Sequence, residues 1–394
     1  MREEINEAVT TLHNRYVRQW KAQGGKVVGY PCSYVPEEII YAGGLLPFRL
    51  RAVEALSTSI GDTYYGPVIC SFPKCILQVA GEGKYGFLDG AIICNGCDSM
   101  RRLDECWRKA SEDYEGILPA YFTYFAVPHK VEDYSLKWFT AHMRDFKEGI
   151  ARHFGVGISD DDLHGAILEY NRGRLLLQQL DELRVADDVP ISGAEATAIV
   201  IAGTGMPRDI FNDLLEGILE QIKSEKRKIE GKRLLLAGSV IDDVSLIKVI
   251  EAAGAVVVAD TLCFGSRSYI DLVDETGDPI EALARRYLNH SFCPRMFGYY
   301  RDRLRYIAER ARRAKVYGVI LQNIRFCDLH GSEHGIFERD LEAQGIPCMR
   351  MEREYGPLAE EGRIQMRVDA FLERLRGQRF KERIKSGAKV SLTI

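Results

Sequence analysis

The chain has 394 residues, of which 46% are hydrophobic and 28% are charged. This length exceeds what one ordinary hydrophobic core holds, so two domains are expected. The 53 basic side chains are balanced by 57 acidic ones, which argues against a nucleic-acid-binding surface. The N-terminus is charged and amphipathic, and no run of 18 apolar residues follows it. We therefore expect a cytoplasmic protein without nucleic-acid or membrane partners.

Residues 1–131 predict a first α/β domain of the Rossmann-like type. Lys26–Tyr30 forms a short apolar run that ends at Pro31, and a helical pattern begins at about Pro36. Further apolar runs alternate with helical stretches, which is typical of a doubly wound parallel sheet. These runs are LPFRLRA from Leu46, PVIC ending at Cys70, GAIIC ending at Cys94 and YFTYFAV from Tyr121.

Residues 132–228 predict a helical connector. Stretches such as LHGAILEYNRGRLLLQQLDEL and DIFNDLLEGILEQI repeat apolar residues with the period of a helix. No strong strand pattern interrupts them. We therefore expect this segment to join two sheet-containing domains.

Residues 229–394 predict a second Rossmann-like domain. It opens with a strand at Arg233–Ala237, a helix that ends at Ala253 and the strand AVVVAD. It continues with helices at 280–287 and 301–314, the strand VYGVILQN, a helix after Cys327, the strand GIPCMRME and a closing amphipathic helix from Gly362. The predicted fold is α/β, with two doubly wound parallel sheets and a ligand crevice between them.

Ten cysteines are distributed along the chain, and several follow predicted strands. A disulfide framework is not expected, because such frameworks belong to small secreted domains. Ligands of an open α/β sheet gather beyond the carboxyl ends of its strands. The cysteines at or just after these ends are Cys32, Cys70, Cys97, Cys263 and Cys327.

These cysteines allow several interpretations. A lone cysteine is most often a small buried hydrophobe, but a shared position after strands favours a ligand role. Thiolates suit iron–sulfur clusters or zinc, although structural zinc generally uses paired CxxC motifs and only Cys94 to Cys97 has that spacing. A thioredoxin-like redox pair at CNGC is disfavoured, because Asp98 would oppose a thiolate.

No nucleotide-binding motif is convincing. The stretch GEGKYG, Gly81 to Gly86, matches the letters of a dinucleotide fingerprint, but it follows a helical stretch where the fingerprint requires a strand. The P-loop pattern G-x-x-x-x-G-K-[ST] is absent from the sequence. We expect this chain to bind no nucleotide, so that any ATP it depends on is hydrolysed by another polypeptide.

With these cysteine positions, the chain resembles the family of 2-hydroxyacyl-CoA dehydratases and ATP-dependent benzoyl-CoA reductases over nearly its whole length. Four stretches together carry the resemblance. They are GYPCSYVPEEIIYAGGLLPFRL (Gly29 to Leu50), CNGCDSMRRLDECW (Cys94 to Trp107), FCDLHGSEHGIFERDLEAQGIP (Phe326 to Pro347) and EREYGPLAEEGRIQMRVDAFLE (Glu352 to Glu373).

The resemblance implies a [4Fe-4S] cluster in the crevice, held by Cys70, Cys97 and Cys327, with one iron open to substrate. Some relatives carry an [8Fe-9S] double-cubane cluster on six thiolates, and Cys32, Cys263 and Cys293 could supply the other three. The remaining cysteines are Cys75, Cys94, Cys106 and Cys348. We assign Cys106 and Cys348 to packing.

The resemblance also implies a function. A separate ATPase activator with its own cluster would supply single electrons, and an acyl-CoA thioester would be reduced to a ketyl radical. The last two stretches look closest to the smaller catalytic subunit of benzoyl-CoA reductase, which would work with a paralogous subunit or as a homodimer. Alternatives are a 2-hydroxyacyl-CoA dehydratase subunit, a double-cubane reductase of small molecules, a non-catalytic electron-storage subunit and a structural zinc protein.

Two histidines are candidates for proton transfer. His330 and His334 follow Cys327 on a predicted helix and share one of its faces. His330 is the candidate proton donor, because histidine is the usual choice near neutral pH. The alternative is that both have structural roles.

Two pairs of charged residues near the cysteines have competing interpretations. Glu37 and Glu38 lie in the first turn of a predicted helix, where the helix dipole favours carboxylates, so a structural role is preferred. Arg101 and Arg102 suit CoA phosphates or a solvated helix face equally well.

Overall fold

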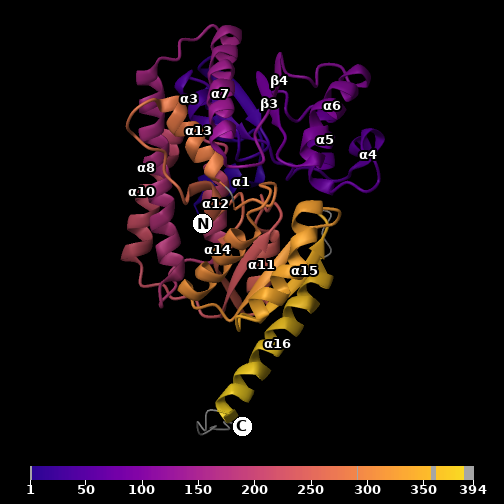
Figure 1. The fold of residues 1–394 in the computed structure, drawn as a ribbon, viewed down its shortest axis with the longest axis vertical. Helices are drawn as coiled ribbons and strands as arrows, with labels where there is room; N and C mark the ends of the chain where they lie inside the picture. Colours follow the sequence, from indigo (N-terminus) through magenta and orange to yellow (C-terminus); the bar gives the residue numbers. More distant parts are fainter. Residues whose placement is uncertain (1, 291, 356–360, 386–394) are drawn as a thin grey trace.

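The computed structural model describes residues 2–290, 292–355 and 361–385. The chain forms two four-stranded sheets in which every strand pairing is parallel. Their strand orders are β2-β1-β3-β4 and β6-β5-β7-β8. Helices cover both sheets, and the N-terminal and C-terminal sheets occupy opposite ends of the molecule (Figure 1). The predicted α/β fold with two Rossmann-like sheets is confirmed.

The first sheet forms because short apolar runs alternate with amphipathic helices. Its two central strands, β1 and β3, are buried along their whole length, as expected for a parallel sheet with both faces covered. The strands are β1 (Val27–Tyr30), β2 (Leu46–Arg49), β3 (Gly90–Cys94) and β4 (Tyr121–Phe125). The helices are α1 (Glu3–Thr10), α2 (Arg15–Ala22), α3 (Glu37–Ala42), α4 (Ser59–Tyr64), α5 (Ser71–Gly81) and α6 (Asp98–Asp113).

The prediction of a strand ending at Cys70 is wrong. Residues 67–69 form a turn, and Cys70 is the N-cap residue of α5. The run PVIC offers only two strand-forming residues after a proline, and the first of them, Val68, is 65% exposed. The pattern was too short to distinguish a buried strand from a turn that leads into a helix.

The predicted helical segment contains α7 (Asp133–Phe154), α8 (Asp160–Val185), α9 (Gly193–Ala202) and α10 (Arg208–Ser224). Helix α8 contacts both halves of the chain: Arg174 pairs with Glu38 of α3, and Gln178 donates to the carbonyl of Tyr269 at 2.8 Å. We propose on this basis that residues 132–228 act as the connector. Within the described part of the chain, no helix combines the length and apolarity needed to cross a membrane.

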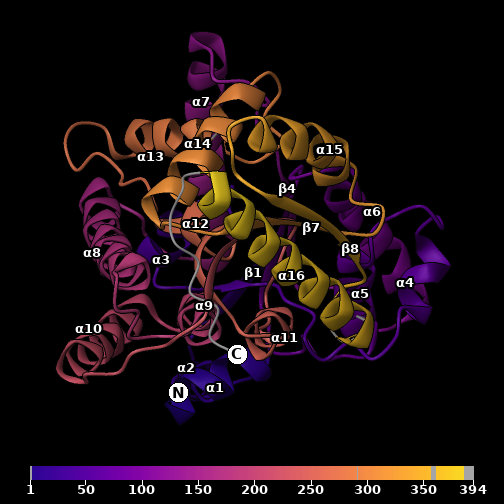
Figure 2. The same ribbon diagram turned by 90° about the horizontal axis from the view of Figure 1, so that it is seen from below.

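The second sheet has the same order of connections as the first. Its strands are β5 (Lys232–Gly238), β6 (Ala255–Thr261), β7 (Gly318–Ile324) and β8 (Cys348–Arg353). The helices are α11 (Ser245–Ala252), α12 (Ser266–Tyr269), α13 (Pro279–Asn289), α14 (Tyr300–Arg313), α15 (Asp328–Glu342) and α16 (Glu361–Lys385). Helix α16 crosses one face of this sheet (Figure 2), where Ile364, Val368 and Phe371 share an apolar cluster with Met349 and Met351.

The end of β5 requires a glycine. Gly238 has a φ of 131°, and a Cβ atom at this position would lie 1.7 Å from the carbonyl oxygen of Gln322 on β7. A side chain would therefore force the two central strands apart. This close approach lies at the carboxyl edge of the sheet. There the chain leaves β5 for β6 on one side, and β7, which follows β6 in the chain, lies on the other side of β5. Ligands generally bind at such a point.

Candidate functional site

Six of the ten cysteines line one cavity in the crevice between the two sheets. The cavity has a volume of about 110 Å³, and residues from both halves of the chain form its walls. Its cysteines are Cys32, Cys70, Cys97, Cys263, Cys293 and Cys327. These are the same six that the family resemblance implied as a first and a second ligand set, and all six line one cavity.

Four of these cysteines follow parallel strands. Cys32 follows β1, Cys97 follows β3, Cys263 follows β6 and Cys327 follows β7. Because the carboxyl ends of parallel strands lie at one edge of a sheet, each sheet presents two thiols to the crevice. Cys293, in contrast, lies in the connection between α13 and α14, where the sequence pattern gave no strand to locate it.

The first ligand set shares a local geometry that the sequence analysis did not identify. Cys70, Cys97 and Cys327 are the N-cap residues of α5, α6 and α15. The Cys97 sulfur accepts the backbone N–H of Met100 at 3.4 Å. A helix N-terminus favours negative charge, so all three positions suit a thiolate that also binds a metal.

Burial opposes that charge when no cation is bound. Burial raises the pKa of Cys70 to about 12, and it also raises the pKa of Cys97 and Cys327. These thiols are therefore protonated in the metal-free chain at neutral pH. Metal binding would release their protons, which makes ligation pH-dependent.

The residue before Cys327 adopts an unusual backbone conformation. Phe326 has a φ of 61°, in the left-handed region that favours glycine. The next amide, that of Cys327, donates to the carbonyl of Ile324 at 2.9 Å and so closes the turn that starts α15. Backbone strain of this kind concentrates at functional sites, and here it adjoins a candidate ligand.

Two buried arginines line the cavity and have no carboxylate partner among the described residues. Arg49 and Arg267 are 3% and 2% exposed. Arg49 donates to the carbonyl of Cys263 at 2.7 Å, and Arg267 donates to the carbonyl of Phe292 at 3.2 Å. The Nε–H group of each lacks an acceptor in the described part of the chain. Burying a guanidinium without a counter-charge is costly, and the Arg49 guanidinium also lies over the Phe264 ring, 3.5 Å from its centroid. The two arginines give this side of the cavity a positive charge.

A second cavity of about 390 Å³ adjoins the first and shares Cys70, Cys97 and Cys327 with it. We call it the vestibule. Its other lining residues include Asn95, Asp98, Arg101, His129, Arg295 and Asp328. Arg295 donates to the carbonyls of Val127 and Pro128, and its own carbonyl lies 3.0 Å from Nδ1 of His129. These bonds fix the rim of the vestibule.

The four remaining cysteines do not line either cavity. Cys75, Cys94 and Cys348 are fully buried, and Cys106 is 8% exposed on α6. Cys348 packs in the apolar layer between β8 and α15 with Phe337 and Leu341. Cys94 contacts Cys32, and a hydrogen bond between the two thiols lowers the pKa of Cys32 and raises that of Cys94.

The structure places His330 on the wall of the six-cysteine cavity. The ring centroids of His330 and His334 are 5.6 Å apart. Burial lowers the pKa of both histidines well below its usual value, so both are neutral at pH 7. His330 therefore lies beside the candidate ligands, and its role as a proton donor stays a prediction, which requires the neutral ring to take up a proton before it donates one.

The charged residues that the sequence singled out have different surroundings. Glu38 is fully buried and pairs with Arg174, and Glu37 pairs with Arg208 at 3.0 Å, which gives both carboxylates partners in the helical segment. Arg101 lines the vestibule. Arg102 instead pairs with Glu105 at 3.2 Å on the exposed face of α6.

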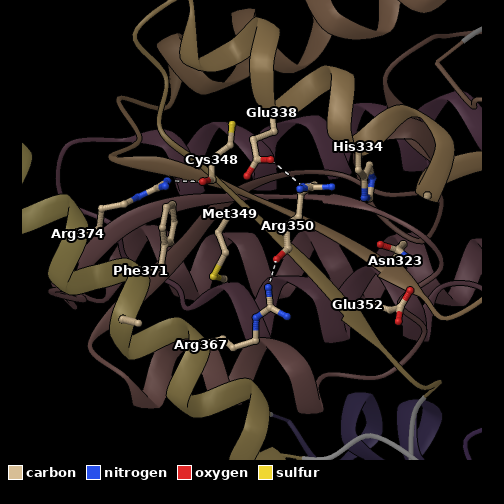
Figure 3. A pocket seen from close by; sticks show the side chains of 12 residues that line it. Asn323, His334, Glu338, Cys348, Met349, Arg350, Glu352, Arg367, Phe371 and Arg374 are labelled. Carbon is tan, nitrogen blue, oxygen red and sulfur yellow. Dashed lines mark hydrogen bonds and ion pairs between the residues drawn. The ribbon is translucent and has the colours of Figure 1, made fainter.

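A larger groove of about 660 Å³ runs along β8, the edge strand of the second sheet (Figure 3). Two of its arginines donate hydrogen bonds to backbone carbonyls. Arg367 donates to the carbonyl of Arg350 at 2.5 Å, and Arg374 donates to the carbonyl of Cys348. A third, Arg350, pairs with Glu338 at 2.7 Å. Charged side chains of this kind block pairing with a further strand, so the groove has a structural explanation.

Within residues 2–290, 292–355 and 361–385, no group of three or more His, Cys, Asp or Glu side chains is placed to hold a single metal ion. The six thiols instead surround a cavity and do not converge on one point. In an iron–sulfur cluster different thiolates bind different iron atoms, so a cluster does not require the six thiols to meet at one point.

Fold and site together define a two-sheet α/β protein with a thiol-lined cavity between its halves. Residues 32–375 match the family model described as "2-hydroxyglutaryl-CoA dehydratase, D-component". The chain belongs to this family, which includes the dehydratases and reductases that it resembles.

Three characterised relatives have similar sequences. A benzoyl-CoA reductase subunit of Thauera aromatica is 30% identical over 321 residues, which cover 79% of this chain and 81% of the relative. The (R)-phenyllactyl-CoA dehydratase beta subunit of Clostridium sporogenes is 26% identical over 94% of this chain and 98% of the relative. The (R)-2-hydroxyglutaryl-CoA dehydratase beta subunit of Acidaminococcus fermentans is 22% identical over 94% of this chain and 97% of the relative. Each of these three relatives is named as a subunit of a dehydratase or of a reductase.

The contact between Cys32 and Cys94 gives a pH-dependent prediction for the metal-free protein. Because the hydrogen bond from Cys94 lowers the pKa of Cys32, alkylation of Cys32 by iodoacetamide should rise with pH around a midpoint below about 8.5, the value of an ordinary thiol. The Cys94→Ala substitution should move this midpoint upward and slow alkylation at pH 7 roughly tenfold for each pKa unit. Mass spectrometry of the Cys32 peptide measures the rate.

Cys106→Ala is the matched control, since Cys106 lies on α6 outside the cavity. This variant should leave the midpoint of Cys32 unchanged. An equal midpoint in the wild-type protein and in Cys94→Ala would contradict the hydrogen bond as the cause.

Proposed function

We propose that the chain is an iron–sulfur catalytic subunit for ATP-driven, one-electron reduction at low potential. The observation that carries this proposal is the convergence of six thiols from six separate segments on one cavity. The unpaired guanidinium groups of Arg49 and Arg267 support it, because a thiolate-bound cluster is anionic and would supply their missing counter-charge. The donor set and its surroundings therefore fit an iron–sulfur cluster.

The number of thiols favours the larger of the two cluster types. Cys70, Cys97 and Cys327 would hold a [4Fe-4S] cluster, and Cys32, Cys263 and Cys293 would complete the six ligands of an [8Fe-9S] double cubane. Either cluster, when bound, supplies single electrons at low potential. We propose the double cubane, because both cysteine sets line the same cavity and the remaining four cysteines lie outside it.

The vestibule is the proposed substrate site. It shares Cys70, Cys97 and Cys327 with the cluster cavity, so a substrate bound there would lie beside these ligands. Arg101 and Arg295 would attract an anionic substrate such as a CoA thioester, and His330 on the adjoining wall would donate a proton. An aromatic acyl-CoA is the proposed substrate class, on the basis of the 30% identity to a benzoyl-CoA reductase subunit.

Two other activities have specific support. A 2-hydroxyacyl-CoA dehydratase subunit is supported by the relative that aligns over 94% of this chain at 26% identity. A double-cubane reductase of small molecules is supported by the six-thiol cavity, because the first ligand set alone would require only three of those thiols. The choice between reductase and lyase depends on the substrate that occupies the vestibule.

The proposed enzyme has several components. Its relatives are named as subunits, which supports a paralogous partner or a second copy of this chain. The sequence has no P-loop, so the ATP would be hydrolysed by a separate activator that carries its own cluster.

Metal analysis tests the cluster. Anaerobically reconstituted protein should contain about eight irons per chain if it holds a double cubane, or about four if it holds one cubane. With a double cubane, Cys263→Ala and Cys293→Ala should each lose about half of the iron or more. Cys106→Ala should lose none, because that cysteine lies outside the cavity. Iron and sulfide assays with EPR spectroscopy measure these contents.

Stoichiometric zinc without sulfide would contradict the iron–sulfur proposal. The Cys70→Ala, Cys97→Ala and Cys327→Ala variants could lose iron while the alanine variants of Cys32, Cys263 and Cys293 keep all of it. That pattern would mean that the site holds a single cubane. That result would leave the proposed low-potential function in place and remove the six-ligand cluster.

Activity assays test the substrate and the proton donor. The chain, its partner subunit and the ATPase activator should reduce benzoyl-CoA when ATP is present. His330→Gln should retain the iron content and lower kcat by about 10²-fold or more, which is the usual contribution of a general acid. Turnover of a 2-hydroxyacyl-CoA alone would identify a dehydratase, and failure with both thioesters and with small reducible molecules would contradict the catalytic proposal.

A further inference from the structure

The cluster cavity is electrostatically asymmetric. Its two unpaired guanidinium groups lie beside the second cysteine set. Arg49 donates to the carbonyl of Cys263, and the charge of Arg49 also lowers the pKa of Cys32. The charge of Arg267 interacts with Cys293 and with Cys263. We call the side of the cavity with Cys32, Cys263 and Cys293 its inner side.

The opposite side of the cavity faces the vestibule. The three cysteines that line both cavities, Cys70, Cys97 and Cys327, belong to this outer side. Two carboxylates, Asp98 and Asp328, also line the vestibule, and the negative charge of Asp328 raises the pKa of Cys70. The outer side is therefore less favourable to added negative charge than the inner side.

Other cations near the cavity do not remove this asymmetry. Arg101 lies in the vestibule, where it is half exposed and 3.7 Å from Asp98, so solvent and the carboxylate both screen it. Arg295 lies between the two sides: it lines the vestibule, yet its charge also affects Cys32 and Cys293. Arg49 and Arg267 alone among these four line the six-cysteine cavity.

Several other arginines of low exposure in the described part of the chain form ion pairs with carboxylates, which Arg49 and Arg267 do not. Arg174 pairs with Glu38, Arg184 pairs with Asp260 at 2.7 Å, and Arg310 pairs with Asp181 at 2.8 Å. Arg49 and Arg267 are equally buried, yet each makes one hydrogen bond, to a backbone carbonyl. Arg51 is also fully buried without an ion pair, but its guanidinium donates to two carbonyls, those of Val9 and Ala8. Arg49 and Arg267 differ from it because they line the six-cysteine cavity, where a group that enters can interact with them.

We propose, on the basis of the function proposed above, that Arg49 and Arg267 are positioning residues that hold the first electron on the inner side of the cluster. Each electron adds one negative charge to the cluster. Two fixed positive charges in a poorly solvated cavity stabilise that added charge at short range. Since charge and hydrogen bonding set the potentials of iron–sulfur centres, the inner side is reduced at a less negative potential than the outer side.

This arrangement gives the two sides different tasks. With a cluster bound, Arg49 and Arg267 would stabilise an added electron on the inner side, and Cys70, Cys97 and Cys327 would hold the part of the cluster that lies next to the vestibule. An arginine suits the inner position because its guanidinium stays protonated at every relevant pH, so that the stabilisation does not depend on a proton.

The test compares the wild-type chain with Arg49→Gln, Arg267→Gln and Arg267→Lys in an anaerobic redox titration followed by EPR spectroscopy. The first reduction should shift to a more negative potential in both glutamine variants, and Arg267→Lys should keep most of the wild-type potential because it keeps the charge. Arg102→Gln is the control, because Arg102 is exposed and pairs with Glu105 outside both cavities. Its potential should equal that of the wild-type protein.

A second measurement uses the cluster-free chain and does not depend on iron uptake. Arg267→Gln removes a buried charge that has no partner, so the cluster-free variant should unfold at the same temperature as the wild-type protein or at a higher one. A lower unfolding temperature would mean that the guanidinium is already compensated and would overturn the proposal.

The outcomes separate this inference from the function on which it rests. Full iron content with an unchanged first reduction potential in both glutamine variants would overturn the role of the arginines and leave the cluster proposal intact. Absence of iron and sulfide from the reconstituted wild-type protein would instead overturn the proposed function itself.

Discussion

The site depends on one constraint, the meeting of two parallel sheets at the carboxyl ends of their strands. Each sheet brings two cysteines to its edge, and three helix N-termini place thiols at the same crevice. Two guanidinium groups without carboxylate partners in the described chain face those thiols. The crevice thus combines thiols that burial keeps protonated with guanidinium groups that have no carboxylate partner, and in the proposed function a bound cluster would change both conditions.

Much of the fold could be predicted from the sequence, because its signals are strong and local. Short apolar runs rich in β-branched residues, such as GAIIC and AVVVAD, favour buried strands, and the structure contains both as β3 and β6. The positions of Cys32, Cys97, Cys263 and Cys327 followed from the same pattern, since ligands gather beyond strand ends. Helical periodicity likewise located α8 and α10.

The missed features depend on contacts between distant residues. The turn before Cys70 resembles a strand in sequence, because four residues with two apolar members carry too little periodicity to decide. Arg49 and Arg267 come from opposite halves of the chain, and their shared cavity exists only in the folded protein. The left-handed conformation of Phe326 is likewise set by the turn from β7 into α15, since the residue itself disfavours it.

The most direct test of the central claim is an anaerobic crystal structure of the reconstituted protein, with anomalous diffraction recorded at the iron absorption edge. Iron density should lie inside the cavity, in contact with the thiolates of Cys32, Cys70, Cys97, Cys263, Cys293 and Cys327. Iron bound by Cys70, Cys97 and Cys327 alone would contradict the six-ligand cluster, and an anomalous signal from zinc, or none in the cavity, would contradict the account as a whole.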